Sequence, residues 1–176
     1  MSPPSFPPGF PPGSSGSSGL PGPLDRELAE AAFVCDLLRV RDLLARGASP
    51  DARDAEGRPP LVSAILGNSV ALVGLLLESK ADVNAVDEHG WTPLHFAAEE
   101  VMPQMASLLL AKGANPNVKD DEGNTPLHRA VFSARGRDEV VRLLRKEGAK
   151  DDVKNKSGET PKSLAERLGE TVFTSN

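Results

Sequence analysis

Hydrophobic residues return along the chain at the three- and four-residue intervals of a helix that buries one stripe. One such stripe consists of Val70, Val73, Leu76 and Leu77. Another consists of Met105, Leu108 and Leu109. This spacing predicts two amphipathic helices of similar length in different parts of the chain. Helices of this kind are expected to end in the left-handed conformation at the glycines Gly47, Gly113 and Gly148.

A shorter helix is predicted ahead of the second stripe, and again one unit later. Thr92 and Thr125 suit the cap of a helix start. Pro93 and Pro126 follow at the first helical position, where a missing N–H does no harm. The small residues after them allow a second helix to pack closely. Each unit is therefore predicted to contain two packed helices.

The two-helix unit repeats with a fixed period. The turn-forming glycines that mark it are Gly57, Gly90, Gly123 and Gly158. They lie 33, 33 and 35 residues apart, and the position after each long helix keeps the same spacings. Two independent markers thus give one period with a two-residue insertion, which we place at 133–138. Between units, the segment ADVNAVDEHG (81–90) predicts an extended stretch followed by a turn.

Two motifs, GWTPLHFAA (90–98) and GNTPLHRAV (123–131), carry a family signature. They resemble the ankyrin repeat, and the resemblance covers about residues 25–173. It implies an all-α solenoid of stacked helix–turn–helix units with β-turn fingers, within 24–176. We expect a disordered Pro/Gly/Ser-rich tail or linker at 1–23. The solenoid is expected to divide into an N-terminal cap (25–56), three repeats (57–89, 90–122 and 123–157) and a C-terminal cap (158–173).

Several positions depart from the family pattern. Pro59 stands where the other repeats have the capping threonine, which should cost roughly 0.5–2 kcal/mol. Lys80 replaces a helix-ending glycine, and a left-handed lysine there should cost about 1 kcal/mol. Val101 occupies the turn between two helices. Because a β-branched residue tolerates positive φ badly, we expect that turn to have a different shape.

The composition suits one soluble globular domain and limits its partners. The chain of 176 residues is 39% hydrophobic and 26% charged, with a formal net charge of −5. This charge argues against nucleic acid as a partner and favours a basic protein surface. No apolar run approaches the roughly 18 residues of a membrane span, so we expect no membrane contact. The single Cys35 excludes an intrachain disulfide framework and favours a reducing, cytoplasmic setting. We expect a monomer.

His95 and His128 stand at the same position of consecutive repeats. A recurring histidine can serve catalysis or metal binding, but a third ligand is lacking because His89 lies at a finger tip. The resemblance implies a structural role instead, in which each imidazole hydrogen-bonds turn backbone and ties one repeat to the next. The sequence has neither a nucleophile elbow nor a phosphate-binding glycine loop. We therefore predict that the protein is not an enzyme, with no catalytic residue, cofactor or metal site.

Stacked repeats present a concave face made of finger tips and first helices, and the resemblance implies protein binding there. Asp87 and Asp120 are expected to brace the fingers by side-chain hydrogen bonds, which leaves their neighbours free. The residues predicted to contact a partner are Glu88, His89, Trp91, Phe96, Glu99, Asp121, Glu122, Asn124, Arg129 and Phe132. The corresponding free positions of the first repeat are Ser63 and Leu66. We expect Trp91 to be exposed. For Phe96 and Phe132 two alternatives stay open, namely exposure or filling of gaps between first helices.

Two roles are compatible with such a module. The short chain and its segment FSARGRDEVVRLL (132–144) look similar to bacterial ankyrin proteins that serve as immunity proteins against secreted toxins. This resemblance implies an inhibitor that occupies the surface of a basic toxin, such as a nuclease. The alternative is a scaffold whose Pro-rich tail docks a second protein. The Pro-Pro pairs of this tail, with Phe6 and Phe10 between them, give it a composition that favours an extended polyproline conformation. The acidic fingers would also keep the protein soluble, whatever its partner.

Overall fold

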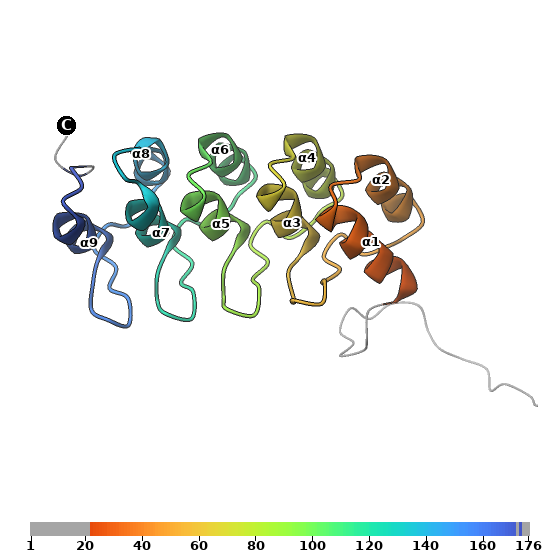
Figure 1. Cartoon of the computed structure of the whole chain (residues 1–176), viewed down its shortest axis with the longest axis horizontal. Coiled ribbons are helices and arrows are strands. Elements are labelled where there is room, and N and C mark those ends of the chain that lie inside the picture. The colour runs from red at the N-terminus through yellow and green to blue at the C-terminus, as the bar shows by residue number, and fades with distance from the viewer. Residues whose placement is uncertain (1–21, 172, 174–176) are drawn as a thin grey trace, which may run out of the picture.

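The computed structural model describes residues 22–171 and 173, and the predicted disordered tail falls largely at 1–21, outside the described residues. The described part folds into nine helices in two layers (Figure 1). The inner layer contains α1 (Pro23–Phe33), α3 (Pro60–Leu66), α5 (Pro93–Glu99), α7 (Pro126–Ser133) and α9 (Pro161–Leu168). The outer layer contains α2 (Leu37–Ala45), α4 (Val70–Glu78), α6 (Pro103–Ala111) and α8 (Glu139–Lys146). The predicted all-α solenoid is confirmed.

The finger turns connect each outer helix to the next inner helix and extend away from both layers (Figure 1). We use this name for residues 54–58, 87–91, 120–124 and 155–159. The last three fingers are joined through their backbones, because Asp121 N donates to His89 O at 3.0 Å and Lys156 N donates to Glu122 O at 2.9 Å. The first finger is linked to the second unit by a side chain instead, since Arg53 Nη1 donates to both Gly57 O and Val86 O.

The helix boundaries follow from local chemistry. Thr92 caps α5, with its hydroxyl oxygen accepting from His95 N, and Ser69 caps α4 in the same way from Leu72 N. No side chain caps α3, as the replacement of threonine by Pro59 predicts. Lys80 has a φ of +67°, so it keeps the left-handed conformation that glycine adopts at equivalent positions.

The prediction that the turn at Val101 differs in shape from the equivalent turns is wrong. Val101 has a φ of +52°, close to the +54° of Cys35 and the +50° of Asn68 at the equivalent turns. Two backbone hydrogen bonds that close the end of α5 impose this conformation, from Val101 N to Ala98 O and from Met102 N to Ala97 O. The Val101 side chain also packs against the core. Helix closure and packing thus outweigh the steric preference of a β-branched residue.

Alanine, leucine and valine side chains fill the core between the two layers. The predicted outer-helix stripe needs one correction, because Val70 is 49% exposed whereas Leu72 is fully buried. Val70 is the first residue of α4, so Leu72, Val73 and Leu76 form the buried face instead. Ser63 was expected to be free on the first helix, but it is buried because α1 and α5 pack on either side of α3.

A ladder of polar side chains ties successive units together. Asp51 Oδ1 accepts from Asp82 N at 2.9 Å, and Asn84 Oδ1 accepts from Asn115 N at 2.8 Å. The same contact recurs one unit later, where Asn117 Oδ1 accepts from Lys150 N. Each bond satisfies a backbone donor of the following unit, so the ladder fixes the spacing of the stack.

At the C-terminal end of the stack, no outer helix follows α9 among the residues described. After α9, the chain returns toward α8, and Phe173 packs against the core with the Arg145 guanidinium 4.8 Å from its ring centroid (Figure 1). The insertion between α7 and α8 takes part in this closure, because Gly136 N donates to Glu170 Oε2 at 3.2 Å. None of the helices described has the length and hydrophobicity needed to cross a membrane.

Candidate protein-binding surface

The finger turns hold their backbone by one repeated aspartate contact. Asp87 Oδ1 accepts from His89 N at 2.9 Å and from Trp91 N at 2.8 Å. Asp120 makes the same pair of contacts with Glu122 N and Asn124 N. The predicted bracing role is confirmed. Because the aspartates face inward, the side chains beside them face solvent, and the exposed ones include Glu88, His89, Asp121 and Glu122.

Trp91 lies at the centre of a cluster that joins two repeats. The Arg129 guanidinium, from the next inner helix, lies 4.2 Å from the Trp91 ring centroid, and the Phe96 ring centroid lies 5.0 Å from that of Trp91. Trp91 is therefore only partly exposed, which corrects the expectation of an exposed tryptophan. Phe96 is likewise partly buried, so it follows the gap-filling alternative in part.

An ion pair fixes the position of Arg129. Its guanidinium donates to Asp120 Oδ2 through both Nη2 and Nε, and it also approaches Glu122 Oε2 at 3.4 Å. Burial alone would raise the pKa of Asp120, but the hydrogen bonds from Arg129 and from Asn124 N outweigh it and lower that pKa. Asp120 thus remains ionised and holds Arg129 over Trp91, although the sequence suggested that Arg129 was free.

A small cavity of about 340 Å³ opens next to this cluster. Its lining consists of His89, Trp91, Asp120, Asp121, Glu122 and Arg129. Five of these six were predicted as partner-binding residues, and the sixth is the bracing aspartate. Asn124 lies beside them but is engaged, because its side chain bridges Glu122 and Asn155. The structure therefore brings residues from two fingers and one inner helix to one place.

A row of mostly apolar residues runs along the ends of the inner helices. Its members are Phe33, Leu66, Glu99 and Phe132, one from each successive unit. Phe33 is 63% exposed, Leu66 is 42% exposed and Phe132 is 58% exposed, so Phe132 follows the exposed alternative. Phe33 was not predicted, although its place one full period before Leu66 could have identified it.

Glu99 interrupts this row with a carboxylate. Its Oε2 atom is buried and makes no hydrogen bond with any residue in the described part of the chain. A buried carboxylate oxygen that lacks a donor costs free energy. A donor supplied from outside, such as an N–H group of a bound protein, would satisfy it.

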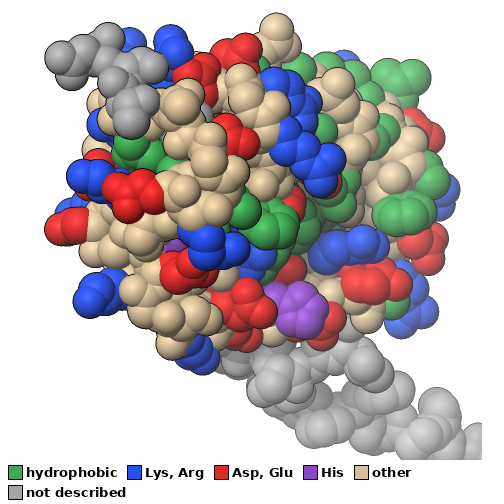
Figure 2. Space-filling view, turned by 60° about the vertical axis from the view of Figure 1, so that its left-hand side comes forward, with side chains coloured by type: hydrophobic (Ala, Val, Ile, Leu, Met, Phe, Trp, Pro, Cys, Tyr) green, Lys and Arg blue, Asp and Glu red, His purple; other side chains and the backbone are tan. Residues whose placement is uncertain are grey.

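The finger edge of the concave face is most acidic in its middle. Figure 2 shows a histidine among acidic side chains at the edge formed by the fingers, with basic side chains close by. Glu88, Asp121 and Glu122 supply the exposed acidic groups of the two middle fingers. In the first finger Arg58 pairs with both Asp54 and Glu56, and the last finger carries Lys156 as well as Glu159. Exposed acidic groups of the fingers are therefore densest around the Trp91 cluster.

The two recurrent histidines bind turn backbone. His95 Nδ1 accepts from Thr92 N at 3.0 Å, which places the proton on Nε2, and Nε2 donates to Asn124 O at 3.1 Å. His128 makes the equivalent contacts with Thr125 N and Glu159 O. Burial lowers the pKa of His95 to about 4 and also lowers that of His128. Each neutral imidazole thus links its own helix start to the next finger.

No group of three His, Cys, Asp or Glu side chains within residues 22–171 is arranged as a metal site would require. The geometry instead defines a class, namely a helical repeat solenoid with a face built from fingers and inner helices. A family model described as ankyrin repeats (3 copies) matches residues 28–120 and 102–155. The chain belongs to the ankyrin-repeat family. A comparison with curated protein sequences finds no matching relative. Ankyrin repeats are protein–protein interaction modules and are typically noncatalytic.

Proposed function

We propose that the protein binds another protein through its concave face, with the Trp91 cluster at the centre of the interface. The observation that carries this proposal is the Asp120–Arg129–Trp91 arrangement beside exposed acidic side chains. Trp and Arg are the residues most enriched among those that dominate binding energies. Here both are held in place before any partner arrives, so little side-chain entropy remains to be lost on binding.

The partner is a protein with a basic surface. Glu88, Asp121 and Glu122 surround the Trp91 cluster, and complementary charge accelerates encounter and selects among partners. The apolar row extends the contact away from the fingers, and Glu99 within it would accept a hydrogen bond from a donor on the partner. These features support an interface with an apolar row and an acidic edge.

Two roles follow for such a binding protein. As an inhibitor, it would act by occupying the surface of a basic toxin, which agrees with the acidic middle fingers and requires no chemistry of its own. As a scaffold, it would use the concave face for one partner and the Pro-rich tail for a second. The acidic middle fingers suit the inhibitor role, because complementary charge would speed the encounter with a basic toxin.

Charge reversal tests this proposal with a matched control. The Glu88→Lys/Asp121→Lys variant changes two exposed finger residues, and Glu78→Lys/Glu147→Lys makes the same charge change near the ends of outer helices. Each variant would be used to capture proteins from a lysate of the source cells, followed by mass spectrometry. We expect a basic protein to be captured by the unchanged chain and the control, and to be lost by the finger variant.

Evidence of binding through the outer helices would overturn the assignment of the interface to the concave face. If the outer-helix variant loses the captured protein and the finger variant retains it, the interface lies on the outer layer. Removal of residues 1–21 separates the two roles, since a scaffold would lose one of two captured proteins and an inhibitor would lose none.

A further inference from the structure

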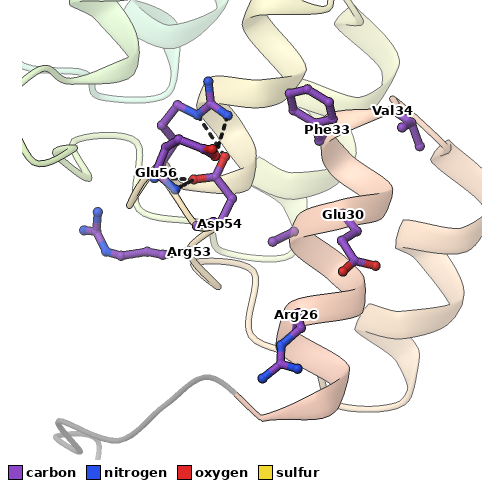
Figure 3. A pocket seen from close by; sticks show the side chains of 10 residues that line it. Arg26, Glu30, Phe33, Val34, Arg53, Asp54 and Glu56 are labelled. Atoms are coloured by element: carbon purple, nitrogen blue, oxygen red, sulfur yellow. Dashed lines mark hydrogen bonds and ion pairs between the residues drawn. The ribbon is translucent and has the colours of Figure 1, made fainter.

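A second cavity, of about 790 Å³, lies at the N-terminal end of the concave face (Figure 3). It is bounded by α1 on one side and by the first finger turn with Arg53 on the other. Its volume falls within the range of roughly 300–1,000 Å³ that is typical of ligand pockets. The small side chains Ala29 and Ala55 leave this space open between the two walls.

The walls combine exposed apolar surface with fixed guanidinium groups. Phe33 is 63% exposed and Val34 is 68% exposed. The Arg58 guanidinium lies 5.7 Å from the Phe33 ring centroid and is held by Asp54 Oδ2 at 2.8 Å. Arg53 is also fixed, because its Nη1 donates to two backbone carbonyls. An aromatic ring entering the cavity would meet Phe33 and the guanidinium of Arg58.

The lining carries no net formal charge. Its three arginines are balanced by three acidic residues, namely Glu30, Asp54 and Glu56. The cavity therefore favours an uncharged occupant that is apolar and aromatic. This requirement differs from that of the acidic middle fingers, so the cavity is not simply part of the same charged surface.

The sequence contains a segment with these properties shortly before α1. Residues 3–12 read PPSFPPGFPP, with no charged residue, two phenylalanines and three Pro-Pro pairs. Such segments bind aromatic-lined grooves at low entropic cost, because proline restricts the free chain. The segment lies outside the described residues, and the described chain begins at Gly22, one residue before α1.

Chain length allows the segment to reach the cavity. The chain that joins Phe10 to Gly22 is rich in glycine and serine. In general, a glycine- and serine-rich chain of about 12 residues has a root-mean-square span of roughly 17–21 Å. The 11 residues of α1 extend about 16 Å from Pro23 to Phe33, where the apolar wall lies. A tether whose average span matches the distance gives an effective concentration in the millimolar range.

We infer that the cavity between α1 and the first finger binds residues 3–12 of the same chain, with the Phe10 ring against Phe33 and Arg58. Phe33 also belongs to the apolar row of the concave face. The bound segment therefore competes with a partner protein for this end of the face. This consequence rests on the proposed protein binding. The cavity site itself does not depend on that function.

Backbone NMR spectra of the full chain test the site directly. The Phe6→Ser/Phe10→Ser variant removes both rings, and Ser14→Ala/Ser17→Ala changes the linker without removing them. We expect the amide signals of Ala29, Val34 and Ala55 to shift in the first variant and to keep their positions in the second. A free peptide of residues 3–12, added to the first variant, should restore the original positions with a midpoint below the millimolar effective concentration of the tethered segment. The same peptide with Phe10→Ser should not.

Three results would overturn the inference. Spectra of the full chain and the Phe6→Ser/Phe10→Ser variant that superimpose would show that the segment does not occupy the cavity. Shifts that disappear on tenfold dilution would show that the segment binds a second copy rather than its own chain. Shifts at Trp91 and Asp121, with none at Val34, would place the segment elsewhere on the concave face. None of these outcomes depends on the capture of a partner, so failure here is distinguishable from failure of the proposed function.

Discussion

Acidification is predicted to destabilise the fold through the two recurrent histidines, because each accepts a backbone hydrogen bond on Nδ1 in its neutral form. The pKa of His95 is lowered by burial from 6.5 to about 4. The unfolded chain therefore binds a proton on this residue more readily than the folded protein does. Stability is fully present above pH 6.5 and is lost as the pH falls from there toward about 4.

The size of the effect follows from the linkage relation. For one histidine with these two pKa values, the free energy of unfolding should be about 2 kcal/mol lower at pH 5 than at pH 7.5. His128 adds a loss in the same direction, since burial lowers its pKa as well. Asp120 contributes below this window, because a lowered carboxylate pKa costs stability only as the pH falls past its ordinary value of 3.8.

Urea denaturation between pH 5 and 7.5 would measure this loss, with His89→Gln as the control. His89 is exposed at a finger tip, so its replacement should leave the pH dependence of the free energy of unfolding unchanged. An NMR titration of the His95 ring measures its pKa without requiring a variant that folds. A His95 pKa near 6.5, or a free energy of unfolding that is constant across this range, would refute the role assigned to the buried neutral imidazole.

Three further predictions concern single positions. Lys80→Gly should raise the thermal midpoint by roughly 2–4 °C, since relief of left-handed strain is worth about 1 kcal/mol. Lys112→Gly is the control, because Lys112 has a negative φ. An unchanged midpoint for Lys80→Gly would contradict the account. Arg129→Met should lower stability by about 3 kcal/mol, because Asp120 loses its charge partner, and Asp120→Asn in the same chain should recover part of it. Arg129→Met should also shift the fluorescence of Trp91, the single tryptophan, to longer wavelength; unchanged emission would show that Arg129 does not cover the ring.

The repeat architecture could be predicted from the sequence because its signals are local and periodic. The Thr-Pro pairs at 92–93 and 125–126 begin helices, and regularly spaced glycines mark the turns. The position of Lys80 at a left-handed helix end also followed from this register. The left-handed conformation of Val101 could not be predicted in this way, because the hydrogen bonds that close α5 override the backbone preference of the isolated residue.

The candidate site was less predictable because its contacts cross repeats. Trp91 is covered by Arg129, which lies in the following repeat and is positioned by Asp120 from a different finger. No local pattern encodes that geometry. Phe33 belongs to the N-terminal helix pair, which lacks the Thr-Pro-Leu-His motif, so its place in the apolar row could be recognised only from its distance of one period from Leu66.

The most direct test of the central claim is comparative capture by the unchanged protein, the Glu88→Lys/Asp121→Lys variant and the Glu78→Lys/Glu147→Lys control. All substituted residues lie at the surface, so circular dichroism should show the same helical content and thermal midpoint in all three. Binding through the concave face predicts a basic protein that is retained by the control and lost by the finger variant. Retention of that protein by the finger variant, with loss by the control, would contradict the account.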